Sequence, residues 1–323
     1  MSALRWICVS LLTLGAVGTC RQAYGTIVGP YTVDADTLHL WHLDEPSAGF
    51  AGYGDASGVA TPITLTSLGS AGNAATQVGV SSYSAAFNNA FQSVQTVETG
   101  IYAKTPAANT TDNTSFASFT GANGAFTYEE MVRFDDASPP VGGVQLISAD
   151  GESGSPTDRA FQFVLDNQGA SGIRLEFENI PGGEGAATGL FSSNISVLPN
   201  TWYHVAVTYN GAENTANNLT FYWTQMLPGT TTATSVGSVV MVHDVTSANS
   251  DFAIGAEARS SGGDTGQWNG AIDEVRISDI ARGPDQMMFG VPEPSSLALA
   301  LLCGIMSLAC GSRSLAKRSL RWN

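Results

Sequence analysis

Cysteine is missing from the central part of this 323-residue chain, residues 26–290, because all four cysteines lie nearer the ends. A disulfide framework, a cysteine-ligated zinc site and a thiol nucleophile are therefore excluded from that central part. Its stability must come from a hydrophobic core, which about 250 residues can bury without covalent cross-links.

Basic residues are also scarce there. Residues 26–290 hold seven Lys and Arg against 27 Asp and Glu, a net charge of −20. Such a surface repels phosphate backbones, so we expect no nucleic-acid partner. It favours solubility outside the cell and attracts divalent cations such as calcium. A solvated acidic surface explains the same charge without any specific ion.

Long apolar runs occur only at the two ends of the chain. Arg5 is followed by an apolar segment of 12 residues at positions 6–17, and small residues follow at Ala23 and Gly25. A positive start, a short apolar stretch and small residues are typical of a secretory signal. We predict that residues 1–25 are a signal peptide.

The C-terminal run has 18 uncharged residues at positions 295–312, enough to span a bilayer, and four basic residues follow it. Basic residues stay on the cytoplasmic side of a membrane. We therefore predict a transmembrane helix at 295–312, held in the inner membrane, and a basic cytoplasmic tail at 313–323.

The linker 289–294 contains the triplet Pro292, Glu293 and Pro294, which keeps helix from extending backward out of the membrane. This triplet, the apolar helix and the basic end together resemble a PEP-CTERM sorting signal. The basic residues here are spread over nine positions rather than packed in one arginine run. The resemblance implies that an exosortase-type membrane protease removes the helix and that the protein reaches the cell surface or an extracellular matrix.

The segment between these signals has strand-like alternation and almost no helical periodicity. Glycine-, asparagine- and serine-rich turns separate segments rich in aromatic and β-branched residues, which favours an all-β sandwich. The predicted strands include LHLWHL (38–43), FTYEEMVRF (126–134), AFQFVLD (160–166), IRLEFE (173–178), WYHVAVTY (202–209) and LTFYW (219–223).

Several of these blocks occur in the order seen in one family. LHLWHLDE, YSAAFNN, FTYEEMVRF, WYHVAVTYNG, FAIGAEA and WNGAIDEVRISDIARGPDQM together resemble a LamG-like domain of the concanavalin A-like lectin/glucanase superfamily. The resemblance covers residues 38–288, after a leader segment at 26–37. It implies a two-sheet antiparallel jelly-roll sandwich with about twelve to fourteen strands.

Glycoside hydrolysis needs two carboxylates about 5–10 Å apart, and residues two apart on a strand face the same side. Glu176 and Glu178 meet this condition. They also fit the solvent side of a strand whose core side is Leu175 and Phe177. We predict no catalytic residue and keep a glycan hydrolase as the less favoured alternative.

Calcium is the ion that the resemblance implies, in a structural role. If the first and last strands adjoin, Asp44 and Asp273 approach one another and offer hard oxygen ligands. Alternatively, Asp273 hydrogen-bonds a neighbouring loop and Asp44 caps a turn.

Sugar binding uses exposed aromatic rings beside hydrogen-bonding groups. Trp268 follows the loop sequence GGDTGQ, so we predict that it is exposed, whereas Trp41 and Trp202 are predicted to lie in the core. The candidate ligand-binding residues are Trp268, Trp223 and Tyr222, with Tyr53 as a further candidate.

These observations predict an exported, non-catalytic binding or adhesion module at the cell surface, with a polysaccharide or cell-surface glycan as its partner. The alternative is a structural protein of an exopolysaccharide matrix that has no specific ligand.

Overall fold

The computed structural model describes residues in the compact unit 27–289. The described ranges are 30–44, 52–59, 62–68, 90–93, 102–104, 120, 123–136, 139–150, 159–180, 188–227, 230–245, 252–257 and 266–287. The predicted signal peptide, sorting triplet, transmembrane helix and basic tail lie outside these ranges. Within them, no helix is long and apolar enough to cross a membrane.

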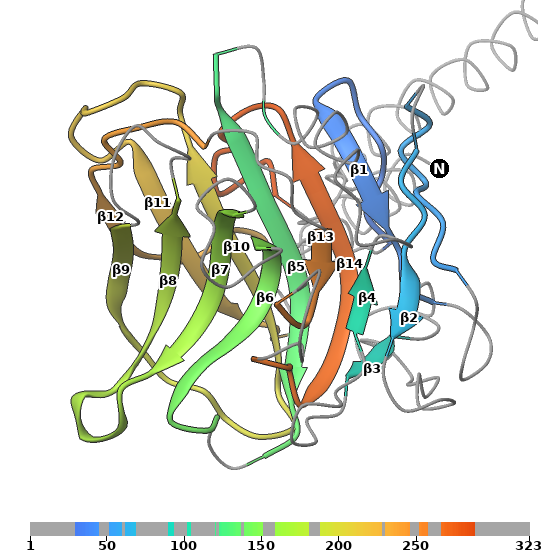
Figure 1. Cartoon of the computed structure of the whole chain (residues 1–323), viewed down its shortest axis with the longest axis horizontal. Helices are drawn as coiled ribbons and strands as arrows, with labels where there is room; N and C mark the ends of the chain where they lie inside the picture. The colour runs from blue at the N-terminus through green and yellow to red at the C-terminus, as the bar shows by residue number, and fades with distance from the viewer. Residues whose placement is uncertain are drawn as a thin grey trace, which may run out of the picture. The chain divides into compact units, whose positions relative to one another are not determined.

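The described residues form two antiparallel sheets packed as layers, which confirms the predicted all-β sandwich (Figure 1). Sheet I has the order β1-β14-β5-β10-β11-β12, and β3 also pairs with β14. Its strands are β1 (Thr37–Trp41), β3 (Phe91–Ser93), β5 (Phe126–Phe134), β10 (Trp202–Tyr209), β11 (Leu219–Gln225), β12 (Ser235–Val239) and β14 (Gly270–Ser278).

Sheet II has the order β2-β4-β13-β6-β7-β8-β9 and lies toward the viewer in Figure 1. Its strands are β2 (Thr66–Leu68), β4 (Tyr102–Lys104), β6 (Gly142–Asp150), β7 (Arg159–Asn167), β8 (Ile173–Asn179), β9 (Thr188–Ile195) and β13 (Phe252–Ile254). A 3₁₀ turn at Gly169–Ser171 joins β7 to β8.

Apolar side chains at every second position of the strands form the core between the sheets. On β10, Tyr203, Val205, Val207 and Tyr209 are buried in that core, as their period of two predicts. Aromatic rings of both sheets meet there: Tyr128 of sheet I stacks on Phe161 of sheet II at 4.8 Å, and Phe161 stacks on Phe177 at 5.6 Å. Aromatic side chains of both sheets therefore contribute to the core between the layers.

The last strand, β14, lies between β1 and β5 in sheet I. The first and last strands of the domain therefore adjoin, which is the arrangement that the predicted approach of Asp44 and Asp273 requires. The chain segment before β1 is fastened to the segment after β14, because Arg282 donates to both carboxylate oxygens of Asp34 at 2.6 and 2.8 Å. Arg276 also lies 4.7 Å from the ring centre of Tyr31.

The outer face of sheet I carries a buried ion network under these terminal segments. Glu129 accepts hydrogen bonds from Arg276 Nε at 2.7 Å and pairs with His204 Nε2 at 3.0 Å. Burial opposes the charge on Glu129, but Arg276 and His204 outweigh it and lower the pKa of this carboxyl to about 2. The buried carboxyl of Glu129 thus has two partners within the protein.

Candidate functional site on the outer face of sheet II

The predicted ligand-binding aromatics are buried. The exposed fraction is 0% for Trp268, 6% for Trp223, 7% for Tyr222 and 2% for Tyr53. The prediction that Trp268 is exposed is therefore wrong.

Its indole nitrogen donates to the carbonyl of Arg133 at 3.2 Å, and its ring packs edge-on against Phe134 at 5.1 Å. The polar loop before Trp268 gave the misleading signal, because the chain turns into the core at this residue. Trp41 is in the core as predicted, but Trp202 is only half-buried.

The two predicted calcium ligands lie near one end of the β1–β14 pair. Asp273 is buried and accepts the backbone N–H of Glu274 at 3.0 Å. Burial raises the pKa of Glu274, and the negative charge of Asp44 adds to that rise, while His42 opposes it. Among the described residues there is no group of three or more His, Cys, Asp or Glu that could hold a metal. Calcium binding at Asp44 and Asp273 stays a prediction.

The outer face of strands β7, β8 and β9 has a different character. Here Leu175 and Phe177 of β8 are in the core, as predicted, and Glu176 and Glu178 are half-buried on the other side. We call the set Gln162, Asp166, Arg174, Glu176, Glu178 and Phe191 the β7–β9 face. It combines an amide, three carboxyls, a guanidinium and an aromatic ring on three neighbouring strands.

One end of the β7–β9 face is rigidly built. Asp166 is buried and accepts hydrogen bonds from Arg174 Nε at 2.9 Å and from Gln168 Nε2 at 2.6 Å. The Arg174 guanidinium in turn lies 3.5 Å from the ring centre of Phe191. A buried carboxylate thus fixes the arginine, and the arginine fixes the aromatic ring.

Glu176 lies beside this ring, because it is the register partner of Phe191. A Cβ at Gly189 would overlap with Glu176 Oε1 and lie 2.8 Å from Phe191 Cζ, so the carboxyl and the ring share the space above this glycine. Burial raises the pKa of Glu176 to about 7, Asp166 and Glu178 contribute to the rise, and Arg174 opposes it. At neutral pH this carboxyl therefore exists in both protonated and ionised forms.

The polar row continues toward β6. Gln162, the register partner of Glu178, accepts a hydrogen bond from Gln145 Nε2 at 3.0 Å. Gln145 is buried, and its side-chain oxygen has no hydrogen-bond partner in the described part of the chain. The amide, guanidinium and carboxyl groups of the β7–β9 face include both donors and acceptors, the inventory that recognises hydroxyl groups.

Sequence reasoning found Glu176 and Glu178 but missed Phe191, Asp166 and Gln162. Alternation along residues 160–166 does place Gln162 and Asp166 opposite the core residues Phe161 and Phe163. Phe191 was hidden, because an irregularity in the β8–β9 register sets its position and no local pattern reveals it.

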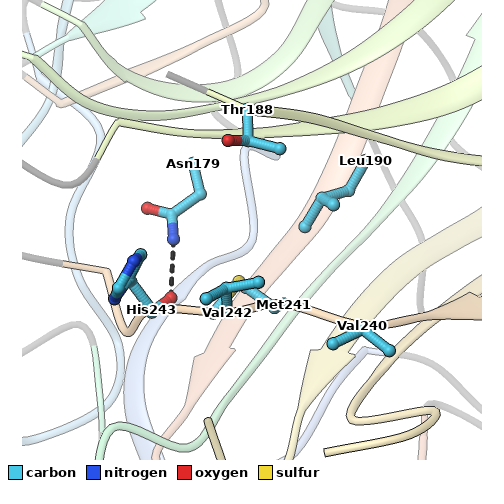
Figure 2. Close-up of a pocket in the computed structure, with 7 residues that line it drawn as sticks. All are labelled: Asn179, Thr188, Leu190, Val240, Met241, Val242 and His243. Atoms are coloured by element: carbon cyan, nitrogen blue, oxygen red, sulfur yellow. Dashed lines mark hydrogen bonds between the residues drawn. The ribbon is translucent and has the colours of Figure 1, made fainter. Parts of the chain in front are cut away.

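A separate small pocket lies where the ends of β8 and β9 meet residues 240–243 (Figure 2). Asn179 Nδ2 donates to the carbonyl of His243 at 2.7 Å, and the amide oxygen of Asn179 is buried without a hydrogen-bond partner among the described residues. The pocket encloses about 30 Å³, which is the space of roughly one water molecule. Its size suits a bridging water rather than a sugar ring.

Comparison with known proteins identifies the fold family. The Laminin_G_3 family, described as the concanavalin A-like lectin/glucanases superfamily, matches residues 102–287. No curated protein sequence matches the chain.

Among solved structures, a heptameric SAP-like pentraxin from Limulus polyphemus is 16% identical over 50% of this chain and 67% of its own, with a TM-score of 0.37. A proposed carbohydrate-binding protein from Bacteroides ovatus is 21% identical over 52% of this chain and 42% of its own, with a TM-score of 0.35.

A Trypanosoma rangeli sialidase is 16% identical over 88% of this chain, with a TM-score of 0.46, and this chain spans 39% of the sialidase. Similarities this low carry no conclusion about ligand or activity. The match to more than half of the sequence, together with the two antiparallel sheets, shows that the chain belongs to the concanavalin A-like lectin/glucanases superfamily.

Proposed function

We propose that this protein is a non-catalytic carbohydrate-binding module and that the β7–β9 face is its binding surface. The observation that carries the proposal is the half-buried ring of Phe191, held by Arg174 beside the carboxyls Glu176 and Glu178. An aromatic ring next to hydroxyl-binding groups is the arrangement that sugars require. Membership of a lectin-containing superfamily supports the proposal.

Phe191 is a better candidate than the other half-buried aromatic side chain in the described ranges, Trp202. The Arg133 guanidinium lies 5.6 Å from the centre of the Trp202 ring, and Arg133 is paired with Asp135 at 2.9 Å. Trp202 also packs against a small apolar cluster on the outer side of sheet I, which includes Leu40 and Met131. It therefore has a packing role that explains its position.

The cellular setting of the proposal rests on the sequence. A signal peptide, a sorting triplet and an apolar C-terminal helix support export by an exosortase-type system to the cell surface or matrix. There the module would bind polysaccharide and mediate adhesion. Cell fractionation tests this setting, since intact precursor found only in the cytosol would contradict it.

Glycan hydrolysis is a second candidate, and one observation favours it. Glu176, with a pKa near 7, retains a proton as a general acid does, and Glu178 is a second carboxyl beside it on the same side of the strand. Their spacing along one strand, roughly 7 Å, lies within the range used by glycosidases. We place this candidate second because a fold hosts many activities and the pair alone does not define a reaction.

A glycan array followed by calorimetry tests the binding proposal. We expect saturable binding that Phe191→Ala reduces at least tenfold, whereas Trp202→Ala, the matched control on the other sheet, leaves it unchanged. Loss of affinity in the control alone, or no binding of any glycan, would contradict the proposal. Release of reducing sugar that Glu176→Gln abolishes would instead establish the hydrolase.

A further inference from the structure

We propose that the β7–β9 face binds neutral glycans in a proton-dependent way, with Glu176 kept protonated beneath the bound sugar. Binding is then tight below neutral pH and weakens above it. This inference rests on the proposed function, because it concerns regulation and ligand class at the same surface.

The groups around Glu176 leave its charge poorly compensated. On β7 its register partner is Val164, and Asp166 lies one position diagonally from it; Arg174 and Glu178 are its neighbours on β8. From β9 only Gly189 and Phe191 lie against it, and neither titrates. Arg174, the one cation among the described residues that lowers the pKa of Glu176, is already bonded to Asp166. Glu176 itself makes no hydrogen bond or ion pair with a described residue.

A sugar lying on Phe191 would cover the carboxyl that shares the space above Gly189. Removing water from this group penalises its charged form further, so the bound state holds the proton more strongly than the free state. By linkage, the ligand prefers the protonated protein. Since the pKa of Glu176 in the free protein is about 7, the dissociation constant should be flat well below pH 7 and rise up to about tenfold per pH unit above it.

Charge also selects the class of glycan. Three carboxyls against one guanidinium disfavour uronic acids and sulfated sugars, because like charges repel across a half-buried surface. A sugar with a permanent positive charge, such as an N-trimethylated amino sugar, would act in the opposite sense from a neutral one, since its cation stabilises the ionised form of Glu176. Opposite pH slopes for neutral and permanently cationic glycans are therefore the signature of this site.

The test measures the affinity of the full-length protein for neutral β-glucan oligosaccharides and for N-trimethylated glucosamine oligosaccharides, whose charge does not change with pH, between pH 5.5 and 8.5. We expect weaker neutral-glycan binding above pH 7, and we expect Glu176→Gln to make the profile flat. Glu178→Gln should keep a pH slope whose midpoint lies lower, because one charge that raises the pKa of Glu176 is removed.

Two results separate the failure modes. Neutral-glycan affinity that persists unchanged from pH 6 to 8.5 overturns the proton dependence but leaves the binding function intact, whereas no binding at any pH overturns the proposed function itself. A carboxyl ¹³C NMR titration of Glu176 needs no ligand. A midpoint below about pH 5 in that titration, near the ordinary value for Glu, overturns the inference on its own.

Discussion

Glu130 is the most anomalous side chain in the core, and it yields a sharp stability prediction. It follows Glu129 on β5 but faces the opposite way, between the core residues Tyr128 and Val132 and opposite Val205. Its exposed fraction is 0%, and neither carboxyl oxygen has a hydrogen-bond partner among the described residues. Burial therefore raises the pKa of Glu130 well above its ordinary value.

The sign of the pH dependence follows from this pKa. In the unfolded chain Glu130 loses its proton near pH 4.5, whereas the folded protein holds the proton to a much higher pH. Between these two values the folded state binds one more proton, so the free energy of unfolding falls as pH rises. The loss is slightly more than 1 kcal/mol per pH unit, or roughly 4 kcal/mol between pH 5 and pH 8 if the folded pKa lies above that range.

Glu130→Leu should remove this dependence and stabilise the protein. At pH 5 we expect a gain of about 1–3 kcal/mol, because an unpaired buried polar group is replaced by an apolar one of similar size. The gain in the free energy of unfolding should increase from pH 5 to pH 8. Glu130→Gln should also lose the pH dependence but gain less, because the amide remains unpaired. Glu176 also titrates in this pH range, but it does so in both proteins. Its contribution therefore cancels when the free energy of unfolding of wild type is subtracted from that of the variant, and the remaining pH dependence comes from Glu130.

Urea unfolding at pH 5, 6, 7 and 8 measures these differences. A gap between Glu130→Leu and wild type that stays constant over this range would refute the reasoning, as would a net loss of stability at pH 8. Glu129→Gln is the control on the same strand. It should destabilise the protein by about 3–5 kcal/mol, because it leaves Arg276 buried without its charged partner.

Four further outcomes are expected. Gly189→Ala should weaken glycan binding at least tenfold by displacing the carboxyl and ring above it, whereas Gly54→Ala, where a Cβ meets nothing within 4 Å, should not. Trp268→Ala should lower the free energy of unfolding by about 3–5 kcal/mol in denaturant melts, as truncation of a core residue does. Arg282→Ala should lower the free energy of unfolding by about 2–3 kcal/mol, because the segment before β1 loses the hydrogen bonds between Asp34 and Arg282. An unchanged melting temperature would contradict that role. If calcium binds the folded state, millimolar calcium should raise the melting temperature and a chelator should reverse the rise.

Alternation predicted much of the fold because each strand buries one side. It placed Leu175 and Phe177 in the core, which is confirmed. The alternation of apolar and polar residues did not predict the strand order. The position of β14 between β1 and β5 depends on contacts between residues far apart in the sequence. The burial of Trp268 was missed for the same reason: its partners, Arg133 and Phe134, lie more than 130 residues away.

The contrast between the two outer faces explains why the candidate site lies on sheet II. On sheet I the buried carboxylate Glu129 has Arg276 and His204 as partners, and chain segments from both ends of the domain cover the network. On the β7–β9 face the Arg174 guanidinium is bonded to Asp166, so Glu176 is left half-buried with its charge uncompensated. A polar group in that state gains most from a partner that arrives from solution. A ligand that supplies hydroxyl groups while excluding water is the kind of partner that the β7–β9 face favours.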